Sequence, residues 1–193
     1  HLTEADIDNV GGVLRSTFLT TGPVTAKFEE TFAGYTGLSH VVGLSSCTAA
    51  LHLSLLALGV GPGDEVITTP MTFIATATAI LHTGATPVFV DVDPDSGLMA
   101  ADHVEAAITP LTKVIVPVHL YGTMVDMRAL REVADHHGLG IVEDCAHCLE
   151  GERDGIRPGM LSEAACYSFY ATKNLTCGEG GAVATRYSWL AEK

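Results

Sequence analysis

Short apolar runs rich in Val and Ile alternate with helical patterns along this chain, and this alternation constrains the fold more than any other feature. The seven strand-like runs are residues 41–46, 65–70, 87–92, 114–119, 140–145, 166–170 and 181–185. Helical patterns lie between several of them, at residues 48–58, 72–82, 101–108 and 127–137. Strands that alternate with helices predict an α/β fold, with a mainly parallel seven-stranded sheet and helices on both faces.

The two ends of the chain depart from this pattern. Residues 1–37 predict an N-terminal helical segment: an amphipathic helix, a loop around residues 20–23 and a second helix over residues 24–35. Residues 38–193 form the expected large domain. The last eight residues, 186–193, begin a helix that is not continued. The chain is therefore expected to be cut at this point.

The charge of the chain limits its partners. Ten basic residues against 23 acidic ones give a formal net charge of −13. Such a surface repels nucleic acid and anionic membranes. No apolar run reaches 18 residues and the first residues do not resemble a signal peptide, so a cytoplasmic protein is expected. Five irregularly spaced cysteines do not form the pattern of a disulfide framework.

A lysine directly follows one strand-like run and precedes a glycine-rich segment. Lys173 stands in the run Ser-Phe-Tyr-Ala-Thr-Lys-Asn-Leu at residues 168–175, and Gly178, Gly180 and Gly181 follow. Burial at a strand end disfavours the ammonium form and makes a better amine nucleophile. An ordinary exposed lysine at a strand end explains the same pattern equally well.

Two further segments place polar groups where strands end. Asp144 follows an apolar strand, at the sheet edge where open α/β folds bind ligands. A buried carboxylate there needs a donor, and a pyridinium nitrogen is one such donor. Residues 45–50 bring hydroxyls to a helix N-terminus, which can bind a phosphate. A turn aspartate and an ordinary helix cap are the simpler explanations of each segment taken alone.

Together with two more segments, these motifs resemble the DegT-type (DegT/DnrJ/StrS) sugar aminotransferases in their order and spacing. The five segments are residues 46–53, 70–76, 117–122, 143–147 and 168–181, and the resemblance extends from Leu2 to about Thr185. Members of this family are fold-type I enzymes dependent on pyridoxal phosphate (PLP), and they aminate keto groups on nucleotide-linked sugars. The resemblance implies PLP as cofactor, glutamate or glutamine as amino donor, a keto-sugar as acceptor, and a homodimer.

The resemblance also implies a role for each residue around the cofactor ring. Lys173 matches the lysine that holds PLP as a Schiff base, and Asp144 matches the acid that bonds the pyridine nitrogen. These two are the expected catalytic residues. His147 stands where the family has Gln or His beside the ring, and Phe73 matches the aromatic residue that stacks on its face.

A second group of residues is implied at the cofactor phosphate. Thr48 and Ala49 match the phosphate-binding positions of the family, and Ser168 matches a serine that also reaches the phosphate. The family usually has Gly where this chain has Cys47. Because a residue with a Cβ tolerates positive φ less well than Gly, this turn is where the chain departs from the family pattern.

Other interpretations stay open at this point. Some family members are sugar dehydratases with His in place of the lysine, and Lys173 argues against that branch. Others aminate inosose rings or make aminohydroxybenzoate. From a different class, the chain could be a truncated, non-catalytic relative with a regulatory or structural role, because relatives complete their sites with a smaller domain and a neighbouring subunit.

No metal site is expected. Cys145 and Cys148 have the spacing of half a zinc site, but the chain has no second pair. Residues 91–97 resemble a calcium loop, yet the Gly falls one place late and no Glu stands at the twelfth position. We expect free thiols and a strand-ending turn instead. His119, which follows a strand at the same sheet edge, is expected only as a neighbour of the cofactor.

Overall fold

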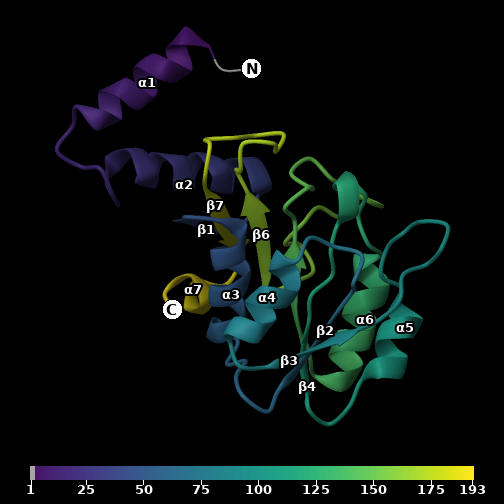
Figure 1. Cartoon of the computed structure of the whole chain (residues 1–193). Coiled ribbons are helices and arrows are strands. Elements are labelled where there is room, and N and C mark those ends of the chain that lie inside the picture. The colour runs from purple at the N-terminus through teal and green to yellow at the C-terminus, as the bar shows by residue number, and fades with distance from the viewer. Residues whose placement is uncertain (1–2) are drawn as a thin grey trace.

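Seven strands form one sheet in the computed structural model, which describes residues 3–193 (Figure 1). The strand order is β1-β7-β6-β5-β4-β2-β3, and only β7 runs antiparallel to its neighbours. The predicted mainly parallel, seven-stranded sheet is therefore confirmed. The strands are β1 (His40–Leu44), β2 (Glu65–Thr68), β3 (Thr86–Phe89), β4 (Thr112–Ile115), β5 (Gly140–Asp144), β6 (Ala164–Ser168) and β7 (Gly181–Thr185).

Helices cover both faces of the sheet, as the alternating pattern predicts. One core contains α3 (Cys47–Ala57), α4 (Ala75–His82) and α7 (Ser188–Ala191), and the other contains α2 (Pro23–Thr36), α5 (Ala101–Ala107) and α6 (Met127–His137). Successive strand residues enter opposite cores because side chains alternate along a strand. In β5, for example, Ile141 packs in the core of α6 and Val142 in the core of α3.

Helix α1 (Glu4–Leu14) extends away from the rest of the chain (Figure 1), and none of its residues is buried. A capping box between Thr3 and Asp6 begins this helix. The predicted amphipathic helix is present, but its apolar side chains at Ile7, Val10 and Leu14 stay exposed. Within residues 3–193, no helix is long and apolar enough to span a bilayer.

Two elements near the sheet edge differ from the predicted bounds: one helix begins later and one strand ends earlier. The helix expected over residues 72–82 starts at Ala75, because the residues before it form a turn in which the Thr72 amide donates to the Pro70 carbonyl. Regular pairing in β4 ends at Ile115, two residues before Pro117, which has no amide to donate.

The segment 91–97 is a turn, as expected. The Asp93 carboxylate accepts hydrogen bonds from the amides of Asp95 and Ser96 and from the Ser96 hydroxyl. The bond from the Ser96 amide lowers the pKa of Asp93. Gly97 completes the turn with a φ of 70°, in the left-handed region that glycine favours.

Candidate active site

A cavity of about 760 Å³ opens at the carboxyl edge of the parallel strands. The ends of β4, β5 and β6, the N-terminus of α3 and the turn before α4 all contribute to its wall. This is the position at which open α/β sheets bind ligands. Its polar lining consists of Ser46, Cys47, Thr48, Thr72, His119, Tyr121, Asp144, His147, Ser168, Tyr170, Thr172, Lys173 and Glu179, and Phe73 is among its apolar residues.

Asp144 ends β5 and is only 5 % exposed. Thr76 donates to its Oδ2 at 2.7 Å, and the Ala146 amide donates to its Oδ1 at 3.1 Å. The thiol of Cys47 lies 4.0 Å from the same Oδ1. Because desolvation and the nearby carboxylate raise the pKa of Cys47 well above its ordinary value, this thiol stays neutral, and the nearer acceptor for its proton is the Cys166 carbonyl at 3.4 Å. The carboxylate is thus surrounded by donors on the protein side while it lines the cavity.

The N-terminus of α3 forms one end of the cavity. The first amides of a helix have no partner within the helix. The hydroxyl of the N-cap residue Ser46 accepts from the Ala49 amide, which leaves the amides of Cys47 and Thr48 for a ligand. Cys47 is the first residue of α3 and does not have positive φ, because among the described non-glycine residues only Tyr121 and Asp154 do. The turn therefore accommodates the Cβ that Gly would lack.

Gly181 fits closely against this turn. A Cβ added to Gly181 would lie 2.3 Å from the Ser46 carbonyl carbon and 2.5 Å from the Cys47 nitrogen. Only glycine allows β7 to approach the helix N-terminus this closely. The glycine-rich segment after Lys173 therefore fixes the anion-binding end of the cavity.

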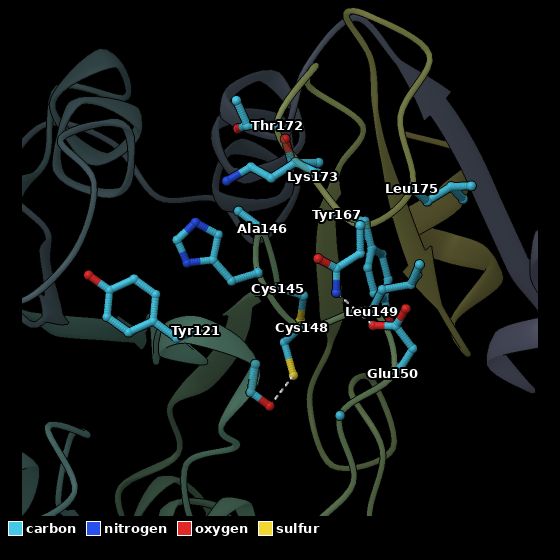
Figure 2. A pocket seen from close by; sticks show the side chains of 15 residues that line it. Tyr121, Cys145, Ala146, Cys148, Leu149, Glu150, Tyr167, Thr172, Lys173 and Leu175 are labelled. Atoms are coloured by element: carbon cyan, nitrogen blue, oxygen red, sulfur yellow. Dashed lines mark hydrogen bonds between the residues drawn. The ribbon is translucent and has the colours of Figure 1, made fainter. Parts of the chain in front are cut away.

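The half-buried Lys173 lies between two cavities. A second cavity of about 420 Å³ shares several lining residues with the first, among them Tyr121, His147 and Lys173. Figure 2 shows the Lys173 side chain between Thr172 and Ala146, extending toward the side on which Tyr121 lies. An amine at this position can reach ligands in both cavities.

Tyr121 and His147 form a stacked pair at this wall, with ring centroids 5.6 Å apart and an interplanar angle of 7°. Tyr121 has a φ of 52°, which is unusual for a non-glycine residue, and is 80 % exposed. Partial burial and the nearby Lys173 ammonium lower the pKa of His147 below its ordinary value. His147 is therefore a neutral imidazole near pH 7.

Behind the cavity, His119 and Glu143 form a buried pair. The His119 Nε2 lies 2.6 Å from the Glu143 carboxylate, and the Val125 amide donates to its Nδ1 at 3.2 Å. This assigns the remaining ring proton to Nε2, so His119 is neutral and donates to Glu143. Gly159 and Ser162 donate to the second carboxylate oxygen. The ligand atoms of His119, Glu143 and Cys145 lie close enough together to hold a metal ion. The polar atoms of His119 and Glu143 are, however, already paired with each other and with their neighbours.

The structure brings six of the seven predicted cofactor-binding residues to one cavity, namely Thr48, Phe73, Asp144, His147, Ser168 and Lys173. Ala49 is not part of its lining, because its amide is used by the helix cap. Cys145 and Cys148 are free and buried, as expected. Burial raises the pKa of Cys148 to about 12.

Sequence reasoning missed Thr76 and Tyr121. Thr76 follows Phe73 by three residues, so a helix that starts here places both on one side, and this spacing could have identified it. The strained backbone of Tyr121 has no comparable signal, since no residue type in its neighbourhood other than Gly122 indicates positive φ.

Comparisons with known proteins agree with this geometry. The model of the DegT/DnrJ/EryC1/StrS aminotransferase family matches residues 1–193. The spore coat polysaccharide biosynthesis protein SpsC of Bacillus subtilis (strain 168) is 48 % identical over 188 residues, which cover 97 % of this chain and 48 % of SpsC. The chain thus spans about half the length of this relative.

Two solved structures are similar over nearly the whole chain. DesV of S. venezuelae, in complex with a ketimine intermediate, has a TM-score of 0.94 and 48 % identity, and the match covers 98 % of this chain and 52 % of DesV. DesI, solved in the presence of its TDP-sugar product, has a TM-score of 0.93 and 42 % identity over 100 % of this chain and 49 % of DesI.

Proposed function

We propose a function for this chain, which belongs to the DegT/DnrJ/EryC1/StrS aminotransferase family. The protein is a PLP-dependent aminotransferase that transfers an amino group from glutamate or glutamine to a keto-sugar. The observation that carries this proposal is the single cavity that contains an amine, a buried carboxylate and a helix N-terminus. These groups suit the aldehyde, the pyridine nitrogen and the phosphate of PLP in turn.

The phosphate would be held by the N-terminus of α3. Its free amides, with the hydroxyls of Thr48 and Ser168, offer the hydrogen bonds that an anion requires. Gly181 allows the close approach on which this end of the cavity depends. The site therefore supplies local donors for an anion in a chain with a net charge of −13.

The ring would be held by Asp144 and Phe73. PLP, when bound, supplies an electron sink for the electrons released at the substrate carbon. The Asp144 carboxylate, already oriented by Thr76 and the Ala146 amide, keeps a proton on the ring nitrogen. Phe73 is 72 % exposed at the cavity wall, so its ring is available to stack on the cofactor. His147, as a neutral imidazole, offers one donor and one acceptor.

Lys173 would first hold the cofactor through its Nζ. Once released by the amino substrate, the same amine would take the proton from the substrate carbon and deliver it to the C4′ carbon of the cofactor. Its position between the two cavities suits this transfer, because a substrate in either one lies within its reach. The Tyr121–His147 stack lines both cavities beside this position.

The proposals on the sugar substrate, the oligomeric state, the domains and the location follow the family resemblance. We propose that the keto-sugar is nucleotide-linked, in support of which DesI was solved with a TDP-sugar product. We propose a homodimer, supported by the exposed apolar side chain of Ile74, which follows Phe73 in the sequence. Residues 38–193 would be the large cofactor-binding domain, preceded by the helical segment 1–37. The five free cysteines support a reducing, cytoplasmic location.

Spectroscopy of the purified full-length protein tests this function. Addition of PLP should produce the visible absorbance band of a lysine-bound cofactor, and glutamate or glutamine should then remove it. Lys173→Ala should abolish the band, whereas Lys27→Ala, which alters an exposed lysine on α2, should retain it. A band that survives Lys173→Ala contradicts the assignment. A band that neither amino donor removes favours a non-catalytic relative.

A further inference from the structure

The carboxylate of Asp144 is braced by two threonines from the turn that begins α4. Thr76 is 1 % exposed, and its Oγ1 lies 2.7 Å from the Asp144 Oδ2. The Thr72 Oγ1 lies 2.8 Å from the Thr76 Oγ1 on the other side. The three side chains thus form a chain of hydrogen bonds, and Thr72 and Asp144 both line the cavity.

Proton counting fixes the direction of this chain. Thr76 has one hydroxyl proton and three acceptors within reach, the Asp144 carboxylate at 2.7 Å, the Thr72 hydroxyl at 2.8 Å and the Phe73 carbonyl at 3.2 Å. A charged acceptor at the shorter distance makes the stronger hydrogen bond, so the proton lies toward Asp144. Thr76 then accepts from Thr72. Each hydroxyl polarises the next toward the carboxylate.

An ordinary helical threonine does something different, and α4 contains one. The Thr78 hydroxyl bonds only the Ala75 carbonyl of its own helix, as helical threonines commonly do. Thr76 has the same option but makes its shortest bond across 68 residues of sequence, to another element. The Thr76 hydroxyl therefore makes its stronger hydrogen bond to Asp144 and its weaker one to the helix backbone.

The same turn also carries Phe73, which lies between the two threonines in sequence and on the cavity wall. One short segment therefore positions Phe73, which is assigned to the ring face, and the two threonines that support Asp144, which is assigned to the ring nitrogen. A shift of this turn would move the two together.

We propose that Thr76, relayed by Thr72, is a positioning residue that orients the Asp144 carboxylate toward the cofactor nitrogen and stabilises its charge. This inference rests on the proposed function, because it needs PLP in the cavity. Thr76 does not touch the cofactor in this account and acts only through Asp144.

Isosteric replacement in the full-length protein tests the role. Thr76→Val keeps the shape and removes the donor, Thr76→Ser keeps the donor, and Thr78→Val makes the same change as a control on the same helix. The measured quantities are the Kd for PLP and the position of the visible band of the bound cofactor. The melting temperature of each apo-protein reports on the fold.

Thr76→Val should raise the Kd on the order of tenfold or more, the size expected for losing a hydrogen bond to a charged acceptor, and should shift the band. Thr76→Ser should restore both, and Thr78→Val should match the wild type. Equal Kd and band positions in wild type and Thr76→Val overturn the inference, and so does a Thr76→Ser variant as impaired as Thr76→Val.

Failure of the proposed function and misfolding of a variant can each be distinguished from failure of this inference. A wild-type protein that binds no PLP overturns the proposed function and this inference with it. If Thr76→Val does not fold, Thr76→Ser against Thr76→Ala makes the same comparison with smaller side chains. In that pair, equal affinity for PLP overturns the role of the hydroxyl, and tighter binding by Thr76→Ser supports it.

Discussion

Gly181→Ala is the substitution whose effect the structure defines most sharply. The new Cβ would lie 2.3 Å from the Ser46 carbonyl carbon, whereas ordinary van der Waals contacts begin at 3.4 Å. The atoms it meets belong to the backbone, so no side-chain rotation relieves the overlap. The turn between Ser46 and Cys47 must therefore move by about 1 Å, a displacement that takes an amide out of hydrogen-bonding range.

The consequence for the cofactor follows from that displacement. One charge-assisted hydrogen bond to the phosphate would be lost, which contributes about 1.5–3 kcal/mol, and the Kd for PLP should rise on the order of 10-fold to 100-fold. Overpacking should also lower the free energy of unfolding of the apo-protein by roughly 3 kcal/mol. Titration of the apo-protein with PLP and chemical denaturation measure the two quantities.

Gly34→Ala is the matched control. Gly34 lies inside α2, and a Cβ there meets nothing within 4 Å. The change should stabilise the protein by about 0.5–1 kcal/mol and leave the Kd unaltered. If Gly181→Ala binds PLP as the wild type does, the N-terminus of α3 is not the phosphate site and the reasoning fails.

Three further predictions concern burial and protonation. Glu143→Ala should lower the free energy of unfolding by about 3–5 kcal/mol in denaturant, because it leaves the buried donors of His119 and Gly159 unpaired, whereas the exposed Glu152→Ala should change it by less than about 0.5 kcal/mol. Since the pKa of His147 is lowered, the folded state binds fewer protons than the unfolded state between that pKa and about 6.5. Stability should thus fall as pH decreases through this window, and His147→Gln should flatten the profile; an unchanged profile contradicts the pKa direction. A thiol reagent should label Cys177 alone in the native protein, and rapid labelling of a second thiol would contradict the burial of the other four.

The sheet was predictable because its signal is local. Apolar runs such as 140–145 fix the strands, and helices between parallel strands must cover the faces. The boundaries were less predictable: α4 begins at Ala75, three residues late, because the turn after Pro70 satisfies its own backbone groups. Propensity alone does not report such competition between turn and helix.

The site residues also differ in whether the sequence alone predicts them. Lys173 and Asp144 stand in dense motifs at strand ends, and both of these predicted residues line one cavity. Thr76 acts through a contact 68 residues away, and Tyr121 adopts a backbone conformation that its residue type does not favour. Contacts between distant segments and strained dihedrals arise from tertiary packing, so the sequence alone does not indicate them.

Borohydride reduction shows directly which lysine of the protein holds the cofactor. The chain has four lysines, and reduction in the presence of PLP fixes the cofactor covalently to the one that holds it. Peptide mass spectrometry of the reduced full-length protein should place the cofactor on Lys173 and on no other lysine of this chain. Modification at Lys27, Lys113 or Lys193 instead, or none at all, would contradict the account.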